Sequence, residues 1–304
     1  MDNPIRIGTR DSKLALWQAE AVATELRAHN IECVIVPVKS QGDIDLVTPL
    51  HQMGGTGIFT KVLDDSLLRG DIDIAVHSLK DYPTVAPEGI KLGGVLPRED
   101  HRDLLVYKSD LSFLEKENAL IATGSIRRKA QWLNRYPKHN HTNLRGNVQT
   151  RLQKLSDNDW DGAVFAKAGL LRLGIVPENA VELEWMIPAP AQGVVGIVCR
   201  TADRETYDVL QNINHKESWN TSMMERQFLN TLEGGCSAPI GALAIKTNGG
   251  YHFKGGVFSI DGSQKVIIED TFEGSSPKEL GHTAALQVLE NGGKALMTDI
   301  REKL

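Results

Sequence analysis

Residues 5–38 read IRIGTRDSKLALWQAEAVATELRAHNIECVIVPV, and their hydrophobic pattern changes twice. The first four residues predict a short strand that ends in the polar loop Gly8–Ser12. Apolar residues from Leu14 to Leu26 then recur at helical spacing, and the β-branched run 31–38 is typical of a buried strand. A strand, a helix and a strand in this order predict parallel pairing in an α/β domain.

The same alternation of strands and helices continues along the chain. A helix is expected at 126–136, and the segment Pro188–Gly193 is interpreted as a hinge. Further strands are predicted at 72–76, 104–107, 120–122, 162–166 and 194–199. We therefore expect two α/β domains.

The pattern changes character from Ile240 onward. Turn signals at 248–250 and 261–263 separate three runs of strand-forming residues, and a helix is expected at 277–290. The predicted strands are 242–246, 251–259 and 265–272. These features predict a small α+β domain with a three-stranded antiparallel sheet. The expected domains are 1–97 with 196–214 (domain 1), 101–189 (domain 2) and 217–304 (domain 3).

Composition excludes several classes of protein. The 304 residues are 41% hydrophobic and 24% charged, which is ordinary for a globular protein. A net charge of −5 and an aromatic content of 6% disfavour a nucleic-acid binder. The start of the chain carries no recognisable targeting signal, and prolines interrupt the apolar stretch 187–198, so it cannot span a bilayer. The three cysteines lack metal or redox spacing, and we expect a cytoplasmic protein.

The charged residues of one segment of the chain are all positive. Residues 118–156 contain eight lysines and arginines and no acidic residue, although the protein as a whole is acidic. Arginine predominates, and its planar guanidinium suits bidentate binding of carboxylate or phosphate. Two of these cations, Arg127 and Arg128, fall at the predicted start of a helix, where they oppose the helix dipole. We therefore expect the pair to bind anions rather than to stabilise the fold; the alternative is a solvated basic face.

Two loops add reactive side chains to strand ends, where α/β proteins bind ligands. Arg10 follows the first strand, and the segment His77–Asp81 places a hydroxyl, a cation and a carboxylate after another. A turn with a side-chain cap is the alternative for both loops. A Ser/His hydrolase is a weak interpretation of His77 and Ser78, because the two are adjacent and no nucleophile-elbow motif is present.

Three other features were considered as sites. Cys236 follows Gly234 and Gly235, whose flexibility suits a nucleophile or an attachment point better than a buried structural thiol. His139 and His141 lack further metal ligands, so we interpret them as part of a solvated loop and predict no metal site. The segment Gly54–Gly57 lacks the rest of a phosphate-binding loop and is interpreted as a mobile loop.

Taken together, six motifs resemble those of the porphobilinogen deaminase family, in the family's order and over nearly the whole chain. The matching segments are 8–16 (GTRDSKLAL), 77–81 (HSLKD), 123–128 (TGSIRR), 144–152 (LRGNVQTRL), 168–174 (AGLLRLG) and 232–236 (LEGGC). Thr56, Val198, Ser237 and Ala238 depart from residues that are frequent in the family, and none of them is assigned a chemical role.

The resemblance implies both a fold and an activity. The fold would be two doubly wound domains similar to type II periplasmic binding proteins, plus the small C-terminal domain. The activity would be hydroxymethylbilane synthesis in tetrapyrrole and haem biosynthesis. Such a transferase joins four porphobilinogen molecules head to tail, releases ammonia, and frees the product by hydrolysis. A cytoplasmic monomer that passes its product to the next enzyme of the pathway is expected, with no nucleic-acid or membrane partner.

The resemblance also implies roles for individual residues. Cys236 would hold a dipyrromethane cofactor through a thioether, and Asp81 would assist ammonia loss and stabilise the azafulvenium cation. Carboxylates of cofactor and substrate would be bound by Arg10, Ser12, Ser78, Lys80, Thr123, Ser125, Arg127, Arg128, Arg145, Arg151, Arg172 and Gln192. A non-catalytic anion-binding protein of the same architecture is the rival hypothesis. It would need the arginines but neither Cys236 nor Asp81.

Overall fold

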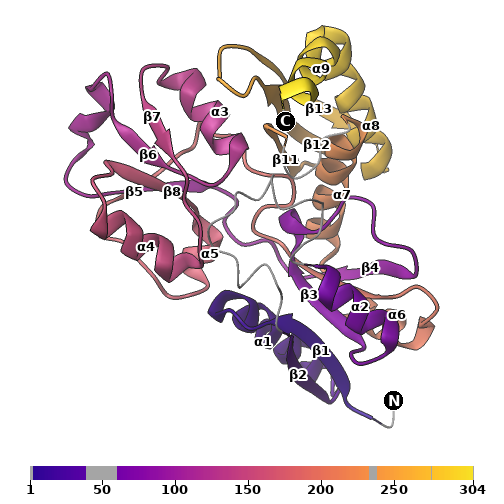
Figure 1. Cartoon of the computed structure of the whole chain (residues 1–304). Helices are drawn as coiled ribbons and strands as arrows, with labels where there is room; N and C mark the ends of the chain where they lie inside the picture. The colour runs from indigo at the N-terminus through magenta and orange to yellow at the C-terminus, as the bar shows by residue number, and fades with distance from the viewer. Residues whose placement is uncertain (1–2, 39–59, 233–237, 275, 304) are drawn as a thin grey trace.

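The computed structural model describes residues 3–38, 60–232, 238–274 and 276–303, which form three sheets with their covering helices (Figure 1). The loop Gly54–Gly57 and Cys236 lie outside the described residues. Within the described residues, no helix is both long and apolar enough to cross a bilayer.

The first sheet has five strands in the order β2-β1-β3-β10-β4. Its strands are β1 (Ile5–Arg10), β2 (Cys33–Val38), β3 (Ile74–Ser78), β4 (Ile90–Val95) and β10 (Val195–Arg200). Helices α1 (Lys13–Ala28) and α6 (Arg204–Asn212) pack on one face through a core that includes Leu26 and Leu210. Helix α2 (Lys61–Arg69) contributes Leu63 and Leu67 to a second core cluster on the same sheet. Helices therefore cover both faces, as expected for a doubly wound domain.

The second sheet repeats this arrangement in the order β7-β6-β8-β5-β9. Its strands are β5 (Asp103–Tyr107), β6 (Leu120–Ala122), β7 (Asn140–Thr142), β8 (Gly162–Ala166) and β9 (Ala180–Glu182). A short 3-10 helix, η4 (Leu111–Glu115), follows β5. Helix α3 (Ile126–Arg135) packs on one face through Trp132, whereas α4 (Val148–Asp157) and α5 (Lys167–Leu171) pack in a separate cluster.

The prediction of parallel pairing holds for the opening unit but not for every strand. Strand β1 pairs in parallel with β2 and with β3, but β10 runs antiparallel to both of its neighbours. In the second sheet β5 is likewise antiparallel to β8 and β9. Each antiparallel strand is the first after the chain crosses between the two domains, so it enters its sheet from the opposite direction.

The third sheet confirms the predicted antiparallel meander. Its strands are β11 (Ile240–Lys246), β12 (Gly250–Phe258) and β13 (Lys265–Glu273). It packs with α7 (Lys216–Thr231), α8 (Pro277–Val288) and α9 (Lys294–Lys303). The last two helices are joined across a kink, η5 (Leu289–Gly293), in which Gly292 has a φ of +102°. The sequence pattern did not predict α9. The domain boundaries themselves stay a prediction.

The turn between β12 and β13 also touches the second sheet's helices. Asn134 Nδ2 donates to the carbonyl oxygen of Gly262 at 2.8 Å, and Gly262 has a φ of +74°. A Cβ atom there would lie 2.5 Å from the backbone nitrogen of Asn134, so only glycine allows this close approach.

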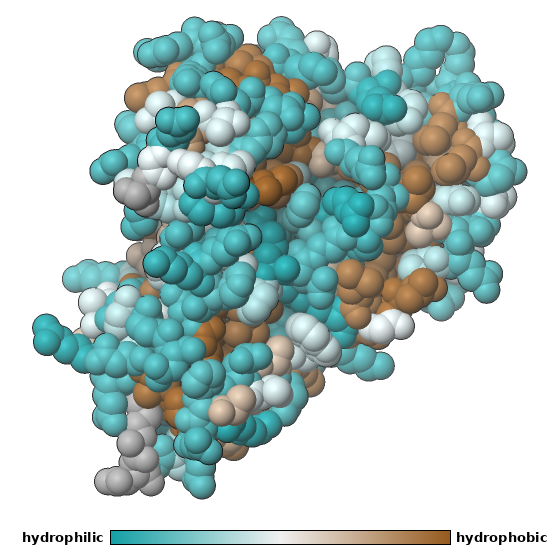
Figure 2. Space-filling view, turned by 180° about the vertical axis from the view of Figure 1, so that it is seen from behind, coloured by the Kyte–Doolittle hydropathy of each residue, from teal (hydrophilic) through white to brown (hydrophobic). Residues whose placement is uncertain are grey.

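On the face shown in Figure 2, hydrophilic residues predominate and apolar residues form separate patches.

Candidate active site

The turn after β3 carries the predicted catalytic carboxylate. Ser78 ends the strand, and a 3-10 turn, η3 (Leu79–Asp81), follows it. Leu79 is fully buried, whereas Asp81 is exposed. Lys80 Nζ lies 3.3 Å from Gln192 Oε1, so two predicted carboxylate-binding residues from distant parts of the chain meet here. The buried turn residue anchors the loop and leaves the Asp81 side chain facing outward.

The other half of this region comes from the end of β1. Ser12 is the N-cap of α1 and accepts from the backbone N–H of Ala15 at 3.3 Å, so the capping interpretation of this loop is correct for Ser12. Gln18, almost completely buried in the second turn of the same helix, donates to Ser78 Oγ at 2.8 Å. Sequence reasoning missed Gln18, because a single glutamine on a helix gives no signal.

His77 supports the argument against a hydrolase. Its ring is buried and lies 4.8 Å from the ring of Tyr82, centroid to centroid. Burial, and to a lesser extent the charge of Arg10, lowers the pKa of His77 to about 3. The imidazole is therefore neutral at physiological pH and serves the core rather than proton transfer.

The start of α3 brings together four predicted site residues. Ser125 is the N-cap and accepts from the backbone N–H of Arg128, and Thr123 Oγ1 accepts from the backbone N–H of Ser125. Arg127 and Arg128 are both buried, with 5% and 6% of their surface exposed. A buried cation needs compensation, and it comes from a residue that the sequence pattern did not single out.

Asp103, the first residue of β5, is that partner. It is fully buried, with Oδ2 2.8 Å from Arg127 Nη1 and Oδ1 2.8 Å from Arg128 Nη2. Gln192 Nε2 donates to Oδ1 at 2.9 Å. Burial alone would raise the pKa of Asp103, but the two guanidinium groups outweigh it and hold that pKa well below its ordinary range. This carboxylate therefore stays ionised and holds both arginines.

The two arginines also donate to backbone carbonyls. Arg127 Nη1 donates to Ile187 O at 2.7 Å, and Arg128 Nη1 donates to Val164 O at 2.9 Å. The expectation that the pair has no structural function is therefore wrong. The helix dipole opposes two cations at this position, but a fully buried carboxylate nearby compensates them, and residue patterns along the helix do not reveal it.

The remaining predicted arginines lie around the same part of domain 2. Arg145 is buried ahead of α4, and Arg151 in α4 donates from Nε to Gly146 O at 2.7 Å. Burial, together with the charges of Arg128 and Arg145, lowers the pKa of Arg151 to about 10, despite the opposing effect of Asp81. Asp81 thus lies within electrostatic range of Arg151, although the two follow strands of different sheets.

Arg172 lies just after α5 and contacts the segment Pro188–Gly193. It donates from Nη2 to Gly193 O at 2.6 Å, and its guanidinium lies 5.4 Å from the ring centre of Trp17. Burial lowers its pKa to about 10. Its Nε is buried and has no hydrogen-bond partner within the described residues. A guanidinium in this state gains stability from a bound anion.

Lys80 adds one more cation to the arginines of the candidate site. Desolvation lowers the pKa of its ammonium to about 8, with Asp81 and Asp103 opposing and the two α3 arginines adding to the shift. Lys80 therefore lies within electrostatic range of Arg127 and Arg128, as Asp81 does of Arg151. Arg10 lies at the end of β1 in the same region, within electrostatic range of His77.

His139 and His141 lie in surroundings that differ from the solvated loop predicted for them. His139 is buried, its Nδ1 accepts from Trp132 Nε1 at 3.2 Å, and its Nε2 contacts Lys116 O at 3.0 Å. His141 belongs to β7, and burial lowers its pKa to about 4. The solvated-loop interpretation is wrong for His139, whose ring is buried, and His141 is a half-buried residue of a strand rather than of a loop. The described residues contain no cluster of three potential metal ligands.

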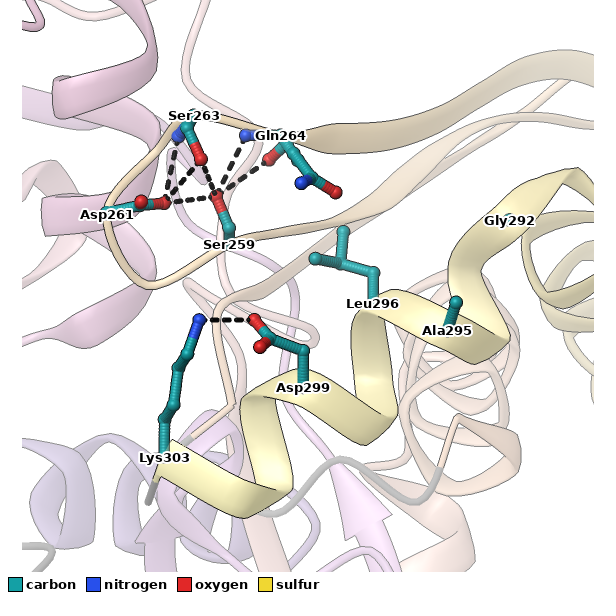
Figure 3. Close-up of a pocket in the computed structure, with 9 residues that line it drawn as sticks. All are labelled: Ser259, Asp261, Ser263, Gln264, Gly292, Ala295, Leu296, Asp299 and Lys303. Atoms are coloured by element: carbon teal, nitrogen blue, oxygen red, sulfur yellow. Dashed lines mark hydrogen bonds and ion pairs between the residues drawn. The ribbon is translucent and has the colours of Figure 1, made fainter.

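A pocket of about 360 Å³ lies elsewhere, in domain 3 (Figure 3). It lies between the β12–β13 turn and α9, and its polar groups already pair with one another. Ser259 Oγ donates to Asp261 Oδ1 at 2.6 Å, and Lys303 Nζ donates to Asp299 Oδ2 at 2.7 Å. None of the predicted site residues lines this pocket. We therefore place the candidate site around Asp81 and the arginines Arg127, Arg128, Arg145 and Arg151 instead.

Comparison with known proteins addresses the same region of the chain. Residues 5–208 match the family model described as "Porphobilinogen deaminase, dipyromethane cofactor binding domain", and residues 219–290 match "Porphobilinogen deaminase, C-terminal domain". The chain belongs to the porphobilinogen deaminase family. The first match covers both α/β domains up to α6, and the second begins within α7 and includes all three strands of the third sheet.

Curated members of the family resemble the chain over most or nearly all of its length. The porphobilinogen deaminase of Trichlorobacter lovleyi is 39% identical, over 98% of this chain and 97% of the relative. That of Desulfitobacterium hafniense is 40% identical, over 99% and 98%. The probable porphobilinogen deaminase of Methanocaldococcus jannaschii is 44% identical, over 79% and 82%.

Solved structures with a similar arrangement of elements are more distant. The periplasmic VFT2 domain of BvgS from Bordetella pertussis matches 69% of this chain and 86% of its own, at 10% identity and a TM-score of 0.43. The ancestral cationic amino acid solute-binding protein AncCDT-1 matches 74% and 94%, at 15% identity and a TM-score of 0.42.

Proposed function

We propose that this chain catalyses the stepwise condensation of four porphobilinogen molecules, with loss of ammonia, followed by hydrolysis to hydroxymethylbilane. Its membership of the porphobilinogen deaminase family, through two family models that together cover most of the chain, carries this proposal. The placement of Asp81 within electrostatic range of Arg151 supports it. The enzyme is then a transferase of tetrapyrrole biosynthesis.

The cofactor of this family is a dipyrromethane, and the cofactor-binding model covers residues 5–208. The residues present fit such a group, because each of its pyrroles carries two carboxylates. Arg151 and Arg172 have pKa values lowered by burial, and the buried Nε of Arg172 has no hydrogen-bond partner within the described residues. Arg127, Arg128, Arg145 and Lys80 add further donors for carboxylates. When bound, the cofactor supplies the pyrrole end onto which the product is built.

Asp81 stabilises the positive charge that forms on the substrate in each condensation step. As the carbon–nitrogen bond of porphobilinogen breaks, the amine leaves as ammonia and positive charge develops on the pyrrole. An exposed carboxylate on an anchored turn stabilises that charge where it forms. A carbon–carbon bond to the growing end follows, and the displaced ring proton is lost. The arginines orient the carboxylates of substrate and chain throughout.

Cys236 is proposed to attach the cofactor through a thioether, and it lies outside the described residues. The test is the intact mass of purified protein. The native chain should carry the mass of two pyrrole units, and Cys236→Ser should carry none and be inactive. Cys33→Ser is the matched control, since Cys33 is a thiol of β2 in the domain 1 core, and it should keep the adduct. An adduct that persists in Cys236→Ser would refute the attachment site.

Asp81→Asn tests the charge stabilisation, because it keeps the side-chain shape and removes the charge. We expect turnover to fall roughly 10²-fold with the cofactor mass unchanged. Turnover near that of the native protein would contradict the assignment. The same preparations can report on the remaining proposals: a monomer by light scattering and a cytoplasmic location by cell fractionation.

A further inference from the structure

Helix α7 of domain 3 lies against the turn that carries Asp81. Arg226 on this helix is 8% exposed. Its Nη1 donates to Leu79 O at 3.1 Å and to Tyr82 O at 2.9 Å, and its Nη2 donates to Pro83 O at 2.5 Å. These carbonyl groups stand on both sides of Asp81 in the sequence. One guanidinium group therefore fixes the backbone before and after the proposed catalytic residue.

A second contact comes from the next turn of the same helix. Asn230 is four residues after Arg226, so the two side chains share one face of α7. Thr84 Oγ1 donates to Asn230 Oδ1 at 3.2 Å. The helix thus holds the segment 79–84 at two successive points, which restrains its orientation as well as its position.

Asp81 depends on this support because its side chain is exposed, while Leu79 and Tyr82 of the same turn are buried. An exposed carboxylate is placed by its backbone, and the backbone of a turn is fixed by what its carbonyl groups contact. Arginine suits this task because its rigid fork presents several donors at fixed angles, whereas lysine presents a single nitrogen.

The same helix leads directly to the segment that contains the proposed attachment site. Helix α7 ends at Thr231 with Leu232 as its C-cap, only six residues after Arg226, a rise of about 9 Å along the axis. Glu225, next to Arg226, pairs with Arg98 and accepts from the backbone N–H of Ala191 and of Ala244. Adjacent residues of α7 therefore hold the Asp81 turn and both segments that connect domains 1 and 2.

We propose that Arg226 is a positioning residue for the reaction: it fixes the Asp81 turn to the helix that leads to the cofactor segment. The carboxylate is then held by its backbone in one orientation on the turn. This inference rests on the proposed role of Asp81. The alternative is a purely structural role, in which Arg226 only holds domains 1 and 3 together. The two hypotheses predict different effects of an Arg226 substitution on kcat once the Asp81 carboxylate has been removed.

The experiment compares Arg226→Lys with a control on the same helix, Met224→Ala. Met224 is fully buried in the domain 3 core, so its truncation lowers Tm without touching the turn. Both proteins are assayed as holoenzyme, with the cofactor confirmed by intact mass. We expect Arg226→Lys to lose roughly 10- to 100-fold in kcat with little change in KM. Met224→Ala should keep its kcat despite a lower Tm.

A double-mutant cycle with Asp81→Asn then separates positioning from structure. If Arg226 acts through Asp81, Arg226→Lys should reduce kcat by less than about threefold in the Asp81→Asn background. A full, multiplicative loss in that background would overturn the proposal, as would a native kcat for Arg226→Lys beside an impaired Asp81→Asn. Native activity of Asp81→Asn itself would instead refute the proposed function of Asp81, so the two failures are distinguishable.

Asn230→Ala provides a variant that does not disturb the core, because Asn230 is exposed. It removes only the contact with Thr84. We expect a loss of about two- to threefold in kcat that disappears in the Asp81→Asn background. An unchanged kcat in Asn230→Ala, together with a multiplicative loss for Arg226→Lys, would leave Arg226 as a structural clamp.

Discussion

Replacing Asp103 with asparagine tests whether one buried carboxylate compensates two arginines of the proposed site. Asp103 is fully buried, and its oxygens lie 2.8 Å from both Arg127 Nη1 and Arg128 Nη2. Asp103→Asn removes the negative charge and leaves both guanidinium groups buried. Breaking a buried ion pair by removing one partner costs about 3–5 kcal/mol, against at most about 1 kcal/mol for an exposed pair. We therefore expect the free energy of unfolding to fall by about 3–5 kcal/mol.

The assay is urea denaturation followed by circular dichroism, on holoenzyme with the cofactor confirmed by mass. Glu117→Gln is the matched control, because Glu117 pairs with Lys138 at the surface with 75% of its side chain exposed. It should change the unfolding free energy by less than about 0.5 kcal/mol. The same reasoning predicts that Arg127→Leu destabilises the protein, which is opposite to the sign expected from the helix dipole alone.

The pH dependence follows from the direction of the pKa shift. The pKa of Asp103 lies below its ordinary value of 3.8, so its contribution to stability is complete above about pH 4 and is lost as the pH falls further. The difference between native protein and Asp103→Asn should therefore be constant from about pH 8 to pH 5. A difference below about 1 kcal/mol at pH 7 would refute the reasoning, since the arginines would then not depend on this carboxylate.

Three further outcomes are expected. Glu225→Gln should lower Tm far more than Gln227→Glu on the same helix, because buried Glu225 holds Arg98 and two backbone N–H groups; equal Tm values would contradict this. The KM for porphobilinogen should rise as the pH increases through about 8, because Lys80 loses its proton there. Lys80→Arg should remove that rise, since arginine keeps its charge; the same rise in the variant would exclude Lys80 as its origin. Arg151→Leu should accumulate enzyme with intermediate numbers of pyrroles in brief incubations with porphobilinogen, more so at high salt. A native distribution of masses would show that Arg151 is not needed for particular elongation steps.

The architecture was predictable from the sequence because it depends on local patterns. The helical spacing of Leu14–Leu26 and the β-branched run after it predicted the opening βαβ unit, and the turn signals at 248–250 and 261–263 predicted the antiparallel sheet. The acid-free segment likewise indicated an anion site, which stays a prediction, although Arg151 of this segment does lie within electrostatic range of Asp81. These features are encoded within a few residues of chain, where periodicity, turn chemistry and charge act directly.

The tertiary structure alone decided which groups compensate one another. Arg128 and Asp103 are 25 residues apart, Gln192 and Asp103 are 89 apart, and Arg226 and Leu79 are 147 apart. The burial of His139 and the antiparallel direction of β10 also depend on where the chain crosses between domains. Such contacts form only when the topology brings distant strand ends and helices together. A charge in a sequence indicates that a partner is needed, but the fold determines which residue provides it.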